Sequence, residues 1–256
     1  MSQFAFYRKV VALNSDVHRN LKFSEKEANF SFARDTTAVL LAGVEFAEAS
    51  REYPIVFIKG QDDQMRPVAL LGVREGENLF VDEQGKWDAR YVPAFVRRYP
   101  FVMADNGPNN QLVVCIDESC AALNAEQGDL LINDEGQLEP RMKEVMQFLE
   151  NFQREFARTE LLAKQLNELD LFVQQGARFD TQSGETFQLN DFYLIDEAKF
   201  GKIPDEKLPD LFRSGALGLG YLHLASLGNM RKLVDRLGAR AGADKADKPD
   251  TNTPVH

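Results

Sequence analysis

One segment, residues 78–101, constrains the fold of this chain more than any other. It contains the only tryptophan, Trp87, together with two tyrosines, three phenylalanines and four basic residues. The pattern predicts a short strand, a tight polar turn at Gly85 and a basic aromatic helix that ends before Pro100, because the residue before a proline is pushed out of the helical region. A basic helix that leaves a sheet must cover apolar surface, so we expect Trp87 and Phe101 to be at least half buried.

Composition and charge limit the classes of protein that the sequence can represent. With 256 residues, of which 44% are hydrophobic, the chain can bury one sizeable core, or two small ones, without disulfides or a metal. The net charge of -10 argues against nucleic acid as a partner, since that would need a concentrated basic face. The chain shows neither a secretory signal nor a run of about 18 apolar residues, so we expect a cytoplasmic protein with no membrane span.

The two cysteines, Cys115 and Cys120, lie five positions apart. This spacing fits neither a Cys-x-x-Cys redox pair nor the cysteine framework of a secreted protein. We therefore expect both to be ordinary reduced thiols, one of them in the core.

The first half of the sequence is typical of antiparallel sheet. Residues 55–58 and 68–73 are apolar, β-branched runs of strand length, separated by a polar connection. We predict an α+β fold with a mostly antiparallel N-terminal sheet and a helical C-terminal half. The expected boundaries are a sheet-rich region over 1–138, a helical region over 139–241 packed on it as one compact unit, and a disordered tail over 242–256.

The second half begins with a strong helical pattern. Over residues 142–166 apolar residues recur at steps of three and four, and Pro140 fits the first turn of a helix. This predicts one long amphipathic helix, or two helices joined near Thr159. Its apolar stripe is typical of a face packed on the core, and its length leaves room for a homodimer seam. Further along, residues 186–197 predict a strand, a bend at Asn190-Asp191 and a second strand.

Two short segments of the sequence are weakly similar to each other. Residues 79–85 resemble residues 130–136: each is a short apolar run followed by acidic or amide residues and a glycine, and each leads into a predicted helix. Acidic residues ahead of a glycine favour a tight turn, because glycine tolerates the left-handed conformation. Either a unit of strand, turn and helix was duplicated, or the same turn chemistry was used twice.

No motif in the sequence specifies a reaction. It has no Gly-x-Ser-x-Gly elbow, no phosphate-binding Gly-x-x-x-x-Gly-Lys loop and no His-Glu-x-x-His helix, so we assign no catalytic residue, no cofactor and no metal. The alternative from another class is a metal-assisted hydrolase or oxygenase that uses His18 with Asp16 and acids from elsewhere in the chain. His223 lies in an apolar helical pattern and fits a hydrogen-bonded core histidine better than a ligand.

Charge is distributed unevenly around the aromatic segment. Between Tyr99 and Pro140 there are eight acidic residues and no lysine or arginine, whereas Arg97 and Arg98 lie just upstream. The two arginines either pair internally with this acidic stretch or form a binding surface for an anionic group.

Tryptophan, tyrosine and arginine dominate binding hot spots. On the binding hypothesis, a peptide or protein partner contacts a set of anchors in the aromatic segment. These are Trp87, Tyr91, Arg97, Arg98 and Tyr99. If the arginines are exposed, replacing both by glutamate is expected to abolish partner recovery and to leave the fold intact. If they pair internally, the same change is expected to lower stability.

An ordered set of short motifs over nearly the whole chain resembles the SapC family of bacterial proteins. The motifs are Phe32-Ala33-Arg34, Glu45-Phe46, Tyr53-Pro54-Ile55-Val56-Phe57, Leu70-Leu71-Gly72, Glu77-Asn78-Leu79-Phe80, Trp87, Tyr91-Val92-Pro93-Ala94, Arg97-Arg98-Tyr99-Pro100-Phe101, Asp196-Glu197 and the predicted helix over 215–226. The resemblance implies a non-catalytic accessory or binding protein linked to surface-layer or outer-membrane receptor systems. It brings no catalytic residues with it.

Overall fold

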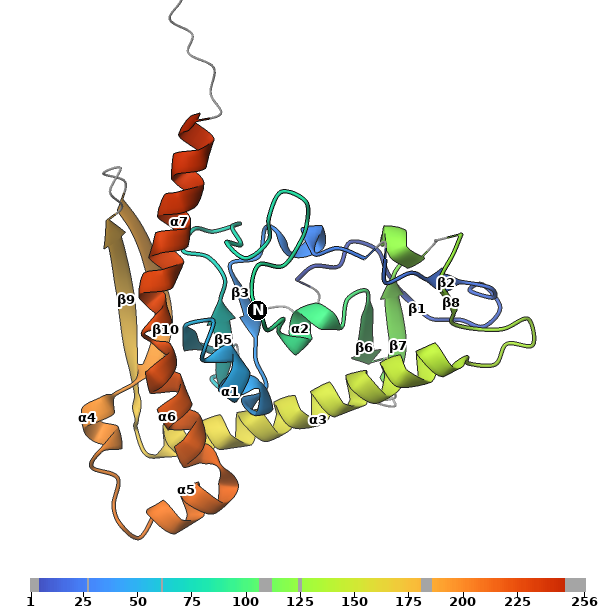
Figure 1. Cartoon of the computed structure of the whole chain (residues 1–256). Helices are drawn as coiled ribbons and strands as arrows, with labels where there is room; N and C mark the ends of the chain where they lie inside the picture. Colours follow the sequence, from blue (N-terminus) through green and yellow to red (C-terminus); the bar gives the residue numbers. More distant parts are fainter. Residues whose placement is uncertain are drawn as a thin grey trace, which may run out of the picture.

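The computed structural model describes residues 5–26, 28–60, 62–105, 112–123, 126–180 and 186–246. The fold is α+β, as the sequence predicts, with antiparallel sheets in the N-terminal half and helices toward the C-terminus (Figure 1). The strands are β1 (Val10–Ala12), β2 (Lys22–Phe23), β3 (Ala38–Leu40), β4 (Ile55–Lys59), β5 (Met65–Leu70), β6 (Phe101–Asp105), β7 (Leu112–Asp117), β8 (Asp129–Leu130), β9 (Phe172–Asp180) and β10 (Thr186–Ile195). The α-helices are α1 (Phe46–Ala49), α2 (Ala94–Arg97), α3 (Pro140–Glu168), α4 (Glu197–Phe200), α5 (Leu208–Ser214), α6 (Ala216–Ser226) and α7 (Asn229–Ala246). Three short 3-10 helices are η1 (Ser31–Ala33), η2 (Gly43–Glu45) and η3 (Ala121–Leu123).

The main sheet has the strand order β3-β5-β4-β10-β9. Its β4–β5 hairpin is the antiparallel ribbon that the sequence predicts. The hairpin of β9 and β10 also joins this sheet, so the mainly helical region after residue 139 contributes two strands to it. The bend expected at Asn190-Asp191 is a bulge within β10, where Asp191 has a φ of +61°. A bulge of this kind bends a strand without ending its pairing.

Helix α3 runs along the molecule beneath both groups of strands (Figure 1). It is one uninterrupted helix, with Pro140 in its first turn as predicted. Thr159 does not break it, because the Thr159 hydroxyl donates to the Glu155 carbonyl, 2.6 Å away, and accepts from the Gly43 backbone N–H at 2.6 Å.

Helix α7 continues to Ala246, five residues beyond the point at which the sequence predicts disorder. Alanine has the highest helix propensity of all residues, and Ala241, Ala243 and Ala246 favour this extension. The rest of the expected tail, 247–256, lies outside the described residues. No helix in the described part of the chain is both long enough and apolar enough to cross a membrane.

Two groups of three strands share one topology. Unit 1 consists of β3, β4, β5 and the turn at Gly85, and unit 2 consists of β1, β6, β7 and the turn at Gly136. The strand orders are β3-β5-β4 and β1-β7-β6, with all pairs antiparallel.

The register of the two units also agrees. The first strand of each unit pairs at equivalent positions, Ala38 with Leu70 and Val10 with Asp117. Each hairpin follows a Tyr-Pro pair whose proline carbonyl accepts a hydrogen bond from the last residue of the hairpin. The donor is the N–H of Leu70 in unit 1, at 2.9 Å, and of Asp117 in unit 2, at 3.0 Å.

The two turns are equally alike. Gly85 and Gly136 both have a φ of +78°, which is the left-handed region that favours glycine. In unit 1 the Gly85 N–H donates to the Asp82 carbonyl at 3.0 Å, and in unit 2 the Gly136 N–H donates to the Asn133 carbonyl at 2.9 Å. The similarity between residues 79–85 and 130–136 is therefore part of a larger structural repeat. This favours duplication of the whole unit over independent use of the same turn.

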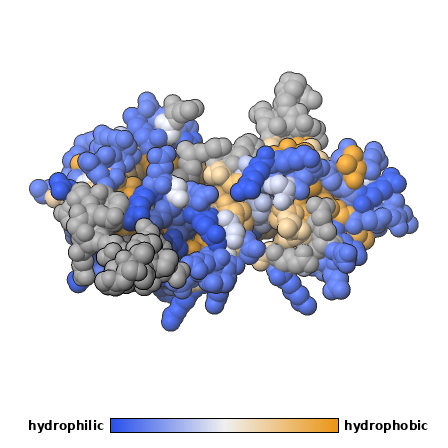
Figure 2. All heavy atoms as spheres, turned by 90° about the horizontal axis from the view of Figure 1, so that it is seen from above, coloured by the Kyte–Doolittle hydropathy of each residue, from blue (hydrophilic) through white to orange (hydrophobic). Residues whose placement is uncertain are grey.

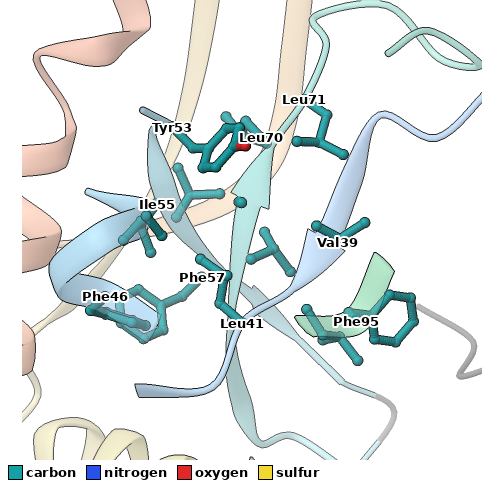
Figure 3. Packing of buried hydrophobic residues seen from close by; sticks show 14 of the residues in the cluster. Val39, Leu41, Phe46, Tyr53, Ile55, Phe57, Leu70, Leu71 and Phe95 are labelled. Carbon is teal, nitrogen blue, oxygen red and sulfur yellow. The ribbon is translucent and has the colours of Figure 1, made fainter. Parts of the chain in front are cut away.

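Each unit has its own hydrophobic core. Unit 1 packs with α1, α2, α6 and α7 around Phe46, Tyr53, Phe57 and Phe95, and Figure 3 shows the side chains directed into this core. Unit 2 packs around Phe23, Phe101, Ile116, Leu131 and Met142. Helix α3 joins the two, because Met142 and Leu149 lie in the core of unit 2, and Phe152, Leu162 and Leu166 lie in the core of unit 1.

Candidate functional site

A cavity of about 610 Å³ lies beside unit 2. Four separate parts of the chain form its walls: the N-terminal segment, the corner between α2 and β6, the residues after β7, and the start of α3. The lining residues are Phe6, Arg8, Phe23, Glu25, Ala28, Asn29, Phe30, Ser31, Phe32, Val96, Arg97, Tyr99, Pro100, Ser119, Cys120, Ala121, Ala122 and Arg141.

A buried carboxylate fixes the corner between α2 and β6. Glu45 is only 5% exposed, and its Oε1 accepts hydrogen bonds from the Ala94 N–H and the Tyr91 hydroxyl, both at 2.7 Å. The first of these bonds holds the N-terminus of α2. Successive residues of a helix point about 100° apart, so the two arginines at the end of α2 face different surroundings.

Aromatic rings form one wall of the cavity. The rings of Phe32 and Tyr99 are stacked with their centroids 3.9 Å apart, and Phe6 packs edge-on against Phe32 at 5.3 Å. Phe23 meets Phe101 edge-on at 5.5 Å. Stacked and edge-on ring pairs are preferred geometries, so the wall is a packed surface and not a loose opening.

Behind this wall lies Asp117, whose side chain is fully buried. It accepts hydrogen bonds from the backbone N–H groups of Arg8 (2.8 Å) and Lys9 (3.1 Å), and from the hydroxyl (2.6 Å) and the N–H (3.0 Å) of Ser119. Burial alone would raise the pKa of Asp117, but these hydrogen bonds outweigh it and lower the pKa. The carboxylate thus ties the N-terminal segment to the residues after β7.

The titratable groups facing the cavity beside Asp117 are held neutral. Burial raises the pKa of the Tyr99 hydroxyl, with further contributions from nearby Cys120 and Asp117. Burial also raises the pKa of the Cys120 thiol. A thiol with a raised pKa is a poor nucleophile, so this wall is suited to contact and not to covalent chemistry.

Arginines supply the charge at the cavity. Arg8 and Arg97 are exposed, whereas Arg141 pairs with Glu25 and lies 3.4 Å from Glu144. In the part of the chain that the structure describes, no carboxylate lies within ion-pair distance of Arg97; its Nε donates to the Val92 carbonyl at 2.9 Å.

A second cavity, of about 300 Å³, continues the first. It shares Phe23, Arg97, Tyr99 and Arg141 with the larger cavity and extends to Phe148 on α3. The two together form an elongated groove, which we call the unit 2 groove. In Figure 2, hydrophobic atoms lie between hydrophilic ones on the side of the molecule where Figure 1 shows β6, β7 and the start of α3.

The sequence-predicted anchors divide into two groups. Arg97 and Tyr99 line both cavities of the groove, and Arg98 lines the smaller one. Trp87 is 5% exposed, which confirms the predicted burial, and its Nε1 donates to the Tyr53 hydroxyl at 2.9 Å. The Tyr53 hydroxyl donates in turn to the Tyr91 carbonyl. Trp87 and Tyr91 therefore hold the turn of unit 1 against the start of α2; neither lines the groove, although the Tyr91 ring centroid lies 5.8 Å from the Arg97 guanidinium.

Arg98 differs from its neighbour. It is 6% exposed, and its guanidinium lies 4.0 Å from the centroid of the Phe95 ring. Burial lowers the pKa of Arg98, and contact with Tyr7 opposes that shift. The condition under which both arginines could be reversed in charge without harm to the fold was that both are exposed; Arg98 does not meet it, because α2 turns this side chain into a buried position.

The residues of the enzymatic alternative lie elsewhere. His18 is 8% exposed; its Nδ1 accepts from the Asn14 N–H at 2.9 Å, and its Nε2 lies 3.3 Å from Glu118 Oε1. Asp16 points to Arg19, 3.4 Å away. Both ring nitrogens of His18 thus have protein partners. Within the described ranges, no three side chains among histidine, cysteine, aspartate and glutamate come together as a metal site would require.

Sequence reasoning missed most of the groove. Phe23 and Phe32 come from the N-terminal segment, Ser119 follows β7 and Arg141 starts α3, and nothing in their local patterns indicates a shared wall. One available signal was the repeated Tyr-Pro pair, Tyr53-Pro54 and Tyr99-Pro100, which marks the same corner in both units.

Comparison with known proteins places this chain in a family. The SapC family model matches residues 13–233, so the chain belongs to the SapC family. No curated protein and no solved structure matches it.

Proposed function

We propose that this SapC family member is a non-catalytic binding protein whose unit 2 groove receives a peptide or protein partner. The observation that carries the proposal is the open groove itself, where Tyr99, stacked on Phe32, lies next to Arg97. Tyrosine and arginine are enriched in binding hot spots, and an exposed arginine beside aromatic rings combines charge recognition with apolar contact.

The groove has the size and composition of a recognition site. Its larger cavity falls within the range of about 300–1,000 Å³ that is typical of ligand pockets, which are lined mainly by apolar residues with a few polar groups. The hydrogen bonds to Asp117 keep two of its walls together without a ligand. A preformed wall lowers the entropy cost of binding.

We extend the proposal to the setting that the family suggests. Such an accessory protein would act with surface-layer or outer-membrane receptor systems from the cytoplasm, and a partner protein from such a system is the first candidate. A metal-assisted activity at His18 is the competing function, and metal analysis of the purified protein distinguishes the two.

The test blocks the groove without touching the core. Ala121 is exposed and lines the larger cavity, so Ala121→Trp would fill space that a partner needs. Tagged full-length protein is used to recover partners from native lysate, with Ala121→Ser as the matched control. We expect the tryptophan variant to lose the partners that the wild type and the serine variant retain, while all three melt alike. Equal recovery by a folded Ala121→Trp variant would remove the groove from consideration.

A further inference from the structure

In unit 1, helix α7 covers the corner at Tyr53-Pro54, which we call the Tyr-Pro corner. Asn229, in the first turn of α7, donates through Nδ2 to the carbonyls of Ser50 (2.6 Å) and Tyr53 (3.1 Å). One turn later, the Lys232 ammonium donates to the Arg51 carbonyl at 3.1 Å. The apolar face of the helix is anchored by Leu233 and Leu237, each 1% exposed.

The equivalent corner of unit 2 opens onto the groove. Aligning Tyr53-Pro54 with Tyr99-Pro100, as the shared register requires, places Val96, Arg97 and Tyr99 at the positions of Ser50, Arg51 and Tyr53. All three line the larger cavity. Part of the groove thus occupies the place on unit 2 that the start of α7 fills on unit 1.

We infer that the partner inserts an acidic amphipathic α-helix into the unit 2 groove, in the position that α7 takes on unit 1. This inference rests on the proposed function and specifies the form of the partner. A helix in a groove buries apolar side chains at spacings of three, four and seven residues. The groove offers apolar side chains from Phe30 and Phe32 past Tyr99 to Phe148.

The charge of the groove determines whether acidic or basic residues are expected on this helix. On unit 1 the covering helix α7 contributes a basic residue and the surface an acidic one, because Arg236 of α7 pairs with Asp88 at 2.6 Å. On unit 2 the two cavities are lined by Arg8, Arg97, Arg98 and Arg141, and by Glu25 and Glu144, both of which pair with Arg141, so positive charge predominates. Net positive charge in the groove favours acidic residues on the helix that fills it, because like charges facing each other across an interface are unfavourable.

The same reasoning excludes a second copy of α7 as the occupant. Described α7 carries five basic and two acidic residues, which are Arg231, Lys232, Arg236, Arg240, Lys245, Asp235 and Asp244. Such a helix would bring further positive charge toward Arg97. An acidic helix from another protein meets both the apolar and the charged parts of the groove.

The inference can be tested before the natural partner is known. A phage-displayed library of random peptides, long enough for about four helical turns, is selected on immobilised full-length protein. Enriched peptides are then synthesised and titrated against the wild type, Arg97→Glu and Arg51→Glu. Arg51 is the unit 1 equivalent of Arg97 and is likewise exposed, so it is a matched control.

We expect the enriched peptides to carry apolar residues at helical spacing together with aspartate or glutamate. Their circular dichroism should become helical on binding, and Arg97→Glu should weaken binding at least about tenfold while Arg51→Glu leaves it unchanged. Peptides that need Arg97 but bind in an extended form would overturn the helix and leave the groove as a binding site. Peptides indifferent to Arg97, or no enrichment at all, would overturn both the helix and the proposed function.

Discussion

Units 1 and 2 have the same strand order, register and glycine turn, but they differ in how the Tyr-Pro corner is closed. In unit 1, Tyr53 is fully buried beneath α7 and hydrogen-bonded to Trp87. In unit 2, Tyr99 is partly exposed and lines the groove. Helix α7 covers the corner of unit 1, whereas the corner of unit 2 has an open surface, which fits the proposal that the two units have a structural and a binding role respectively.

The largest expected effect is on the scaffold corner. Trp87→Ala removes a packed indole and its hydrogen bond to Tyr53, and should lower the free energy of unfolding by roughly 3–5 kcal/mol. The equivalent residue of unit 2, Leu138, is only half buried, so Leu138→Ala should cost less than about 2 kcal/mol. Urea denaturation of both variants measures the difference. Equal losses would mean that the residues after the two glycine turns are packed to the same degree.

The next prediction separates the adjacent arginines. Arg98→Glu places a carboxylate in the core beside Phe95 and should destabilise the protein by roughly 3 kcal/mol. Arg97→Glu changes an exposed group and should cost no more than about 1 kcal/mol. Thermal melts of the two single variants test this contrast. If both variants melt like the wild type, Arg98 does not occupy the buried position described here.

A smaller effect concerns pH and the helices that cover unit 1. His223 on α6 is fully buried, its Nδ1 lies 2.9 Å from the Ile55 carbonyl, and its Nε2 accepts from the Ile195 N–H at 3.0 Å. Burial lowers its pKa from 6.5 to about 4. Protonation would cost Nε2 its role as an acceptor, so the ring remains neutral in the folded state.

The sign of the pH effect follows from this lowered pKa. Below pH 6.5 the unfolded chain binds a proton at His223 that the folded chain excludes, so stability falls as the pH drops from about 6.5 toward 4. The loss attributable to His223 should be about 2 kcal/mol by pH 4.5. The free energies of unfolding of wild type and His223→Gln are measured from pH 7 to 4.5, and the difference between them gives the contribution of His223. If the free energies of unfolding of both proteins fall equally as the pH drops, protonation of His223 does not contribute to the loss.

Local patterns predicted the parts of the fold that depend on local chemistry. The β4–β5 hairpin, the Gly85 turn, the long helix with Pro140 in its first turn and the burial of Trp87 all follow from residue type and spacing. The sequence did not predict β9, and it predicted β10 as two strands. The place of this hairpin in the main sheet depends on pairing with β4, far away in the chain.

The site could be predicted only in part. The sequence identified Arg97 and Tyr99, since tyrosine and arginine next to apolar residues favour binding. It could not distinguish Arg97 from Arg98, because that depends on the rotation of a four-residue helix held by Glu45. The opposite wall of the groove comes from residues 6–32, and only tertiary packing brings it to Tyr99.

The most direct test of the account compares equivalent arginines in the two units. Full-length wild type, Arg97→Glu and Arg51→Glu are used to recover partners from native lysate, and the amount of each partner is quantified. Both positions are exposed, so both variants should fold and melt like the wild type. The account predicts that Arg97→Glu loses its partners at least about tenfold while Arg51→Glu retains them. Equal recovery by both variants, or equal loss, would contradict the claim that unit 2 alone carries the binding surface.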